Sequence, residues 1–169
     1  MKRQESAYLG VVICLQPSEK TSVATDISTH HSSARNGTPQ SNPIPIGTIG
    51  LHRDTQPNRI QHRNVSLNIR LLKDFRSQGY GSEAIEWALD WGFRRAELHK
   101  IKIGHVGWNL GAGKLYQRMG FVREAMLREE LWHDGKWWDL IDMSMLEQEY
   151  WARDEEKKKE QVIDTTRVE

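Results

Sequence analysis

The stretch Val65-Ser66-Leu67-Asn68-Ile69-Arg70-Leu71, followed closely by Arg76-Ser77-Gln78-Gly79-Tyr80-Gly81, decides the fold of this 169-residue chain. In residues 65–71 every second side chain is apolar, which is the period of a strand with one buried face. Residues 76–81 contain two glycines, and from Ser82 onward the period becomes that of a helix. The sequence therefore predicts a strand, a glycine loop and a helix N-terminus in succession.

The helix that begins near Ser82 is amphipathic. Its polar residues fall at spacings of three and four, and they predict a stripe that faces solvent: Glu83, Glu86, Asp90, Arg94 and Glu97. The apolar run Ile101–Val106 then predicts another strand. Strand, helix and strand in this order predict a right-handed crossover between two parallel strands.

A second helix is predicted from Asn109, which can cap it, to Gly120, which can end it. Its apolar residues stand at positions 112, 115, 116 and 119, the spacing of one helix face. Gly111 and Gly113 each weaken such a helix by about 1 kcal/mol relative to alanine. We therefore expect another group to pack closely against its first turn.

The remaining elements give an α/β (α+β) domain with a mixed sheet. Apolar runs predict strands at Tyr8–Leu15 and Ile46–Leu51. Asp134-Gly135 predicts a hairpin that joins residues 121–133 to residues 136–146.

Two segments are predicted to lie outside the folded body. Residues 17–45 are polar and lack an apolar period, so they predict a flexible insertion. Residues 152–169 are rich in charge and predict a solvated helical tail after a domain of residues 1–151.

The composition excludes several classes of protein. A net charge of +1 gives no field for nucleic acid or an acidic membrane, and no apolar run approaches the roughly 20 residues of a membrane helix. The single cysteine, Cys14, cannot form an internal disulfide and is expected to fill the core. The histidines lack metal-ligand spacing. We expect a cytoplasmic protein with no metal and no nucleic-acid or membrane partner.

The glycine loop is the feature that points to chemistry. Backbone N–H groups in such a turn point toward an anion, and the helix dipole adds about half a positive charge. Gly79 and Gly81 fit equally well in a tight turn without a ligand. A dinucleotide site would need an acidic residue about 20 positions further on, where the next strand instead ends in His105-Val106. The stretch Gly111–Lys114 is followed by leucine and not by the hydroxyl residue of a nucleotide P-loop.

Two motifs together resemble the GCN5-related N-acetyltransferase (GNAT) superfamily. Residues 76–81 match its R/Q-x-x-G-x-G/A signature, and Asn109–Phe121 is similar to its N-x-x-A-x-x-L-Y-x-x-x-G-F segment. The resemblance extends from about Tyr8 to Tyr150, and Trp132–Asp139 resembles the RimJ/RimL-like branch, the ribosomal-protein-alanine acetyltransferases. It implies a GNAT-like sheet with a splayed parallel strand pair. It also implies transfer of acetyl from acetyl-CoA to a primary amine, either a protein N-terminus or a small amine.

The resemblance also implies roles for residues. In the family, acetyl-CoA lies in the gap between two splayed strands, here residues 65–72 and 101–106. The tyrosine that protonates the departing thiolate is matched by Tyr116, whose alternative role is a core aromatic. Asn109 would contact the pantetheine arm or order the gap. The remaining cofactor-binding residues would be Leu71, Leu72 and Lys73 along the pantetheine, and Arg76, Ser77, Gln78, Gly79, Tyr80, Gly81 and Ser82 around the diphosphate.

The chain departs from the family pattern at two places. Ser66 stands where many relatives carry a carboxylate that helps to deprotonate the amine, so His105 becomes the candidate base, with a structural histidine as the alternative. The family also has a strand and two helices before the strand that Tyr8 begins, where this sequence has only Met1–Ala7. Either the chain is truncated, or a partner or dimer mate covers that flank, which should present an apolar patch.

These departures leave two hypotheses of different class. Ser66 and the short N-terminal segment favour a non-catalytic acyl-CoA-binding module or a remnant of the fold. The intact glycine loop, Asn109 and Tyr116 favour an enzyme.

Overall fold

The computed structural model describes residues 7–16, 42–53 and 57–166. Residues 17–41, most of the predicted insertion, lie outside the described residues. The predicted end of that insertion at residue 45 is wrong, because Ile44 and Pro45 already belong to a strand.

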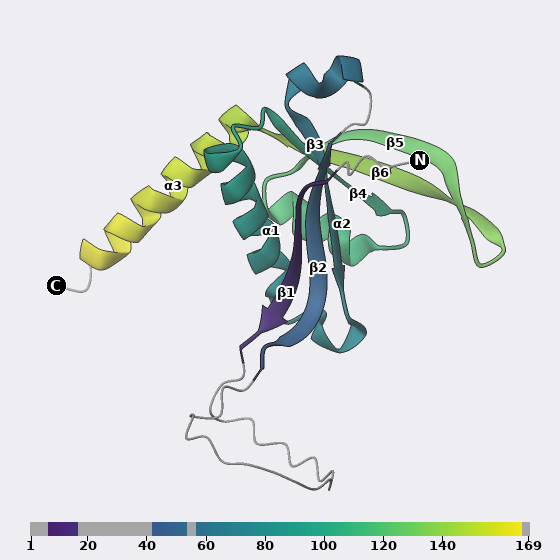
Figure 1. Ribbon diagram of the computed structural model, residues 1–169, viewed down its shortest axis with the longest axis horizontal. Coiled ribbons are helices and arrows are strands. Elements are labelled where there is room, and N and C mark those ends of the chain that lie inside the picture. The colour runs from purple at the N-terminus through teal and green to yellow at the C-terminus, as the bar shows by residue number, and fades with distance from the viewer. Residues whose placement is uncertain (1–6, 17–41, 54–56, 167–169) are drawn as a thin grey trace, which may run out of the picture.

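Six strands form one mixed sheet in the described part of the chain, in the order β1-β2-β3-β4-β6-β5 (Figure 1). The pair β3–β4 is parallel and the other four pairs are antiparallel, so the predicted mixed sheet with a parallel pair and a C-terminal hairpin is confirmed. The strands are β1 (Ala7–Leu15), β2 (Ile44–Arg53), β3 (Asn64–Leu71), β4 (Lys100–Val106), β5 (Val122–His133) and β6 (Lys136–Leu146).

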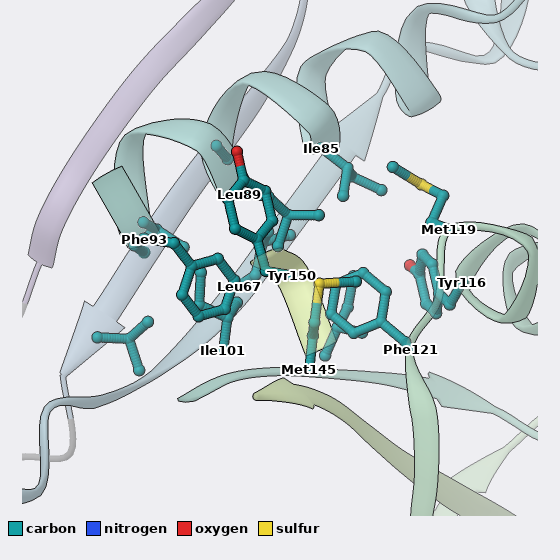
Figure 2. Packing of buried hydrophobic residues seen from close by; sticks show 14 of the residues in the cluster. Leu67, Ile85, Leu89, Phe93, Ile101, Tyr116, Met119, Phe121, Met145 and Tyr150 are labelled. Atoms are coloured by element: carbon teal, nitrogen blue, oxygen red, sulfur yellow. The ribbon is translucent and has the colours of Figure 1, made fainter. Parts of the chain in front are cut away.

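Two helices cover one face of this sheet. They are α1 (Tyr80–Asp90), which continues into a π-helical turn, η3 (Trp91–Arg95), and α2 (Leu110–Arg118). Ile85 of α1 and Tyr116 of α2 belong to the same buried cluster as Leu67 of β3 (Figure 2). Short 3-10 turns, η1 (Pro57–His62) and η2 (Lys73–Phe75), flank β3. The helices therefore lie over the strands that splay, and they hold the loop between β3 and α1 in place.

The C-terminal helix is anchored on the domain. It is α3 (Glu147–Thr166), which begins before the predicted start at residue 152. The buried ring of Tyr150 stacks on Phe93 with centroids 4.9 Å apart, and its hydroxyl donates to Asp90 at 3.1 Å. Only the later part of the helix projects away from the body of the molecule (Figure 1).

The predicted solvent stripe stays partly exposed, with 38%, 51% and 33% of the Glu86, Asp90 and Arg94 side chains accessible, but these three of its five residues also bond to other charged or polar side chains. Arg153 of α3 donates to Glu86 at 2.9 Å, and Arg94 donates to Asp154 of α3 and to Asp90 at 2.6 Å each. A charged stripe on one helix looks the same in sequence whether water or a second charged helix faces it. Here α3 supplies the partners.

The opposite face of the sheet is uncovered in the described part of the chain, and it is polar. Side chains on β3 alternate between buried and exposed, and Ser66, Asn68 and Arg70 are exposed on this face. Its large exposed apolar residues include Val12 on β1, with 57% of its surface accessible, and Val122 and Leu127 on β5, with 53% and 39%. Cys14, expected in the core, is also exposed.

Candidate functional site

The parallel strands β3 and β4 separate part-way along their length. Both strands are fully described, yet their pairing covers only Asn64–Ser66 with Lys100–Lys102. Beyond these residues β3 continues to Leu71 and β4 to Val106. The two strands therefore splay, and they leave two unpaired backbone edges that face each other.

The register shows which backbone groups face this gap. Leu72 N–H donates to the Ile46 carbonyl at 2.9 Å, and bonding to a neighbouring antiparallel strand alternates along a strand. The even-numbered residues of β3 therefore bond to β2. Leu67, Ile69 and Leu71 direct their N–H and C=O groups toward β4 instead.

The alternation of backbone hydrogen bonds also orients β4, which forms the other edge of the gap. Gly107 N–H donates to the Asp139 carbonyl of β6 at 2.8 Å, so the odd-numbered residues of β4 bond to β6. Gly104 then directs its backbone groups into the gap, as does the N–H of Val106, whose carbonyl accepts from Asn109 N–H at 2.8 Å. An extended ligand arm could hydrogen-bond to these edges as an added strand does.

A cleft of about 650 Å³ opens at the gap. Leu67 and Ile69 line it from β3, Gly104 from β4, and Tyr116 from α2. Asn68 and Arg70 of β3, Ile103 of β4 and residues of β1 and β2, including His52, complete its wall. The cleft therefore connects the splayed strands, the polar open face and the buried tyrosine.

The loop before α1 has the backbone of an anion cradle. Gly79 precedes the helix in the left-handed region with φ 92°, and no side chain caps the helix. The N–H groups of Tyr80, Gly81 and Ser82 form the first turn, where a helix provides no acceptor. Ser77 is also left-handed with φ 60°.

Two side chains of the loop hold its shape. Arg76 Nε donates to the Leu71 carbonyl at 3.1 Å, and Gln78 donates to the Asp74 carbonyl at 2.6 Å. The cradle is thus fixed by bonds within the loop, at the end of the strand that borders the gap. The structure brings together all the residues predicted for the diphosphate.

Of the three residues predicted to bind pantetheine, only Leu71 directs its backbone toward the gap. Leu71 directs its backbone toward the gap, but Leu72 N–H is already bonded to β2 and Lys73 lies in η2. Sequence reasoning missed Leu67 and Ile69, whose backbone edges line the gap upstream. The period-two pattern of residues 65–71 identified the strand, whereas the point of splaying depends on the β3–β4 register.

Tyr116 lies in α2 with only 6% of its surface accessible, and it lines the cleft. Burial raises the pKa of its phenol above the usual value of 10.0. A raised phenol pKa means that the hydroxyl remains protonated throughout the physiological pH range. Tyr116 can therefore act as a proton donor at the gap.

His105 packs against the first turn of α2. A Cβ placed on Gly113 would lie 2.6 Å from His105 Nε2, which confirms the expected close packing at this helix. His105 Nδ1 lies 3.1 Å from the Val106 carbonyl. The histidine borders a separate cavity of about 370 Å³ beside α2 and does not line the larger cleft. This placement favours the structural alternative for His105.

Asn109 caps α2 as predicted. Its Oδ1 accepts a hydrogen bond from Ala112 N–H at 3.2 Å. The amide nitrogen of the same side chain has no partner that the described residues supply. It can therefore still donate to a ligand in the neighbouring gap.

Asp142 is the residue that the sequence did not indicate. It pairs with Gly104 across β4 and β6, and its Oδ1 lies 3.2 Å from where a Gly104 Cβ would stand. Its carboxylate therefore occupies the space beside a glycine that lines the cleft. No described residue donates a hydrogen bond to this carboxylate or forms an ion pair with it. Ser66, by contrast, lies in the paired part of β3. Only the β4–β6 register reveals this carboxylate.

The described residues contain neither a candidate metal site nor a candidate membrane-spanning helix. They contain no group of three or more histidine, cysteine, aspartate or glutamate side chains that could hold a metal ion. Their helices include none that is long and apolar enough to cross a membrane.

Comparison with known proteins agrees with this geometry. A family model described as an acetyltransferase (GNAT) domain matches residues 5–122. The chain belongs to the GNAT acetyltransferase family. This GNAT chain is 34% identical over 107 residues to the spermidine N(1)-acetyltransferase of Vibrio cholerae serotype O1, a match that covers 63% of this chain and 61% of the relative. It is 27% identical over 104 residues to the "Putative ribosomal N-acetyltransferase YdaF" of Bacillus subtilis, covering 62% and 55% of the two chains.

Solved structures show the same fold. A mutant form of the spermidine/spermine N-acetyltransferase SpeG from Vibrio cholerae superposes with a TM-score of 0.60 at 30% identity, covering 65% of this chain and 62% of that one. The dodecameric spermidine N-acetyltransferase from Vibrio cholerae superposes with a TM-score of 0.58 at 32% identity, covering 64% and 61%. The GNAT chain thus spans less than two thirds of the length of these relatives.

Proposed function

We propose that this GNAT domain transfers the acetyl group of acetyl-CoA to a primary amine. The observation that carries the proposal is the splayed pair β3–β4, with a buried tyrosine in the cleft and a glycine cradle at the end of β3. Membership of the acetyltransferase family and similarity to spermidine N-acetyltransferases support it.

The backbone edges of the gap suit the pantetheine arm. Its amides would pair with Leu67, Ile69 and Leu71, in place of the strand contacts that β4 does not make. The diphosphate would accept from the N–H groups of residues 79–82 at the start of α1, where the helix dipole adds positive potential. Asn109 would donate to the arm from the other side of the gap.

The transfer step needs one proton taken up and one supplied. A neutral amine forms the new C–N bond at the thioester carbonyl, and the C–S bond breaks. The thiolate that leaves takes the Tyr116 proton, and the amine proton passes to the Asp142 carboxylate, directly or through water. Backbone N–H groups of the gap, such as that of Gly104, can stabilise the developing oxyanion.

Positioning supplies much of the remaining rate. Oriented reactants gain effective concentrations of about 10⁵ M or more. The rigid sheet on one side and the buried packing of α2 on the other would hold the thioester and the amine together. Tyr116 is well suited to protonate the thiolate because burial fixes its ring and keeps its hydroxyl protonated.

The finer assignments are also proposals. Similarity to YdaF and the Trp132–Asp139 segment support a place near the RimJ/RimL-like branch. The acceptor is then either a protein N-terminus or a small amine. The dodecamer formed by one relative supports a further proposal, that copies of this chain associate and cover the short N-terminal flank.

A thiol-release assay with a panel of amines tests the proposed function. Wild-type protein should release CoA in proportion to acetylated amine, and Tyr116→Phe should lower kcat by about 10²- to 10³-fold with little change in CoA affinity. Binding of acetyl-CoA without release for any amine would support the non-catalytic alternative instead. Unchanged release by Tyr116→Phe would exclude Tyr116 as the acid.

A further inference from the structure

A second pocket, of about 490 Å³, is lined by residues of β2, η1, β3 and β4. Its described lining carries four basic side chains and no carboxylate: Arg53, Arg59, His62 and Lys102. The remaining lining residues are Asn64, Val65 and Ser66 of β3. We name this the basic pocket.

The basic pocket and the cleft border the same three strands, β2, β3 and β4. Lys102 borders the first and Gly104 borders the second, two residues further along β4. Two residues of a strand span about 7 Å. On β2 the change from one to the other occurs between His52 and Arg53. A small molecule could therefore reach both at once.

The charges along this path are arranged with opposite signs. Asp142 stands beside Gly104, at the end where the proposed function places the reacting amine. The basic side chains stand at the other end. Among the described acids, Glu124 is held by Lys100, whose hydrogen bond is the main reason that its pKa is lowered, with Lys102 contributing at longer range. Lys102 has no direct bond to a described carboxylate.

From this arrangement we propose that the acceptor is a small primary amine with an anionic group about 7 to 10 Å from its nitrogen, held in the basic pocket. The proposal rests on the proposed function, since it identifies the substrate class of the same cleft. Lys102 and His62 would contact the anion. The nitrogen would lie near Asp142, within reach of the thioester carbonyl.

The same charges act against polycations. The open face near the gap also carries Arg70 and His52, which line the cleft itself. A polyamine that placed one amine at Asp142 would bring its other charges against the basic side chains, and like charges this close repel. This chain should therefore prefer a different acceptor class from the one named for its spermidine-acetylating relatives.

Three amines of equal chain length test the inference: 6-aminohexanoate, hexylamine and 1,6-diaminohexane. We expect kcat/KM to be at least 10-fold higher for the carboxylate than for the diamine, with hexylamine between them. Lys102→Met should reduce the preference for 6-aminohexanoate over hexylamine about 5- to 10-fold. Lys159→Met, an exposed lysine on α3, is the matched control and should leave the preference unchanged.

Each outcome supports or overturns the inference. A diamine or spermidine used better than 6-aminohexanoate would overturn it, as would a preference that Lys102→Met leaves intact, while the proposed function would stand. Calorimetry with 6-aminohexanoate and CoA, which needs no turnover, separates the two claims. Weaker binding in Lys102→Met than in Lys159→Met supports the basic pocket even if no amine is acetylated. Equal binding in both variants overturns it.

Discussion

Replacing Gly79 by alanine separates the strain of the cradle from its function. Gly79 has φ 92°, and a Cβ there would find no atom within 4 Å, so the cost of the alanine is backbone strain and not a clash. A left-handed alanine costs about 1–2 kcal/mol. For a domain of this size that lowers Tm by roughly 2 to 8 °C.

The functional effect arises when the strain is relieved. Rotation of residue 79 out of the left-handed region would turn the N–H groups of Tyr80–Ser82 away from the diphosphate. Loss of one hydrogen bond to a charged oxygen costs about 1.5–3 kcal/mol, which corresponds to about a 10- to 100-fold increase in the Kd for CoA. Pantetheine lacks the diphosphate, so its affinity should not change.

Gly135→Ala is the matched control. Gly135 has φ 76° in the β5–β6 turn, and a Cβ there also finds nothing within 4 Å. Both variants should lose similar stability in thermal melts. Only Gly79→Ala should lose affinity for CoA in calorimetry. Equal CoA affinity in the two variants would refute the role of the cradle, and an equal loss of pantetheine affinity would assign the effect to unfolding.

Three further predictions concern the helices. Gly113→Ala should lower the free energy of unfolding by about 1–2 kcal/mol, because overpacking against His105 outweighs the gain in helix propensity. In a His105→Ala background the same substitution should instead raise the free energy of unfolding by about 1 kcal/mol. Urea unfolding measures both values. Tyr150→Phe should cost about 1 kcal/mol of stability through its lost hydroxyl bond to Asp90, with the ring stack intact by circular dichroism. The Tyr116 acid works in its protonated form, so kcat should stay level up to about pH 10 and fall only above it, and an earlier fall attributable to Tyr116 would contradict its raised pKa.

The elements that local pattern determines could be predicted from the sequence. The alternation of residues 65–71 gives β3, Asn109 gives the start of α2, and Asp134-Gly135 gives the hairpin turn. Each signal lies within a few residues of the feature that it specifies, so no knowledge of the tertiary structure is needed.

The features that were missed depend on partners distant in sequence. Asp142 becomes a candidate site residue only because β6 pairs with β4 opposite Gly104. Arg94 gains a partner in Asp154 only because α3 packs beside α1. The basic pocket combines residues of β2, η1 and β3 with Lys102 of β4, which is far from them in the sequence. These three features could not be predicted because each depends on strand pairing or helix packing between distant parts of the sequence.

The most direct test of the account is amide hydrogen exchange along β3, followed by NMR with and without CoA. Asn68 and Arg70 bond to β2, so their amides should exchange slowly in both states. Ile69 and Leu71 face the gap and should exchange quickly in the free protein, then become protected by at least 10-fold when CoA binds. Protection of these two amides before CoA is added, or no change after it binds, would contradict the claim that the splayed edge receives the pantetheine arm.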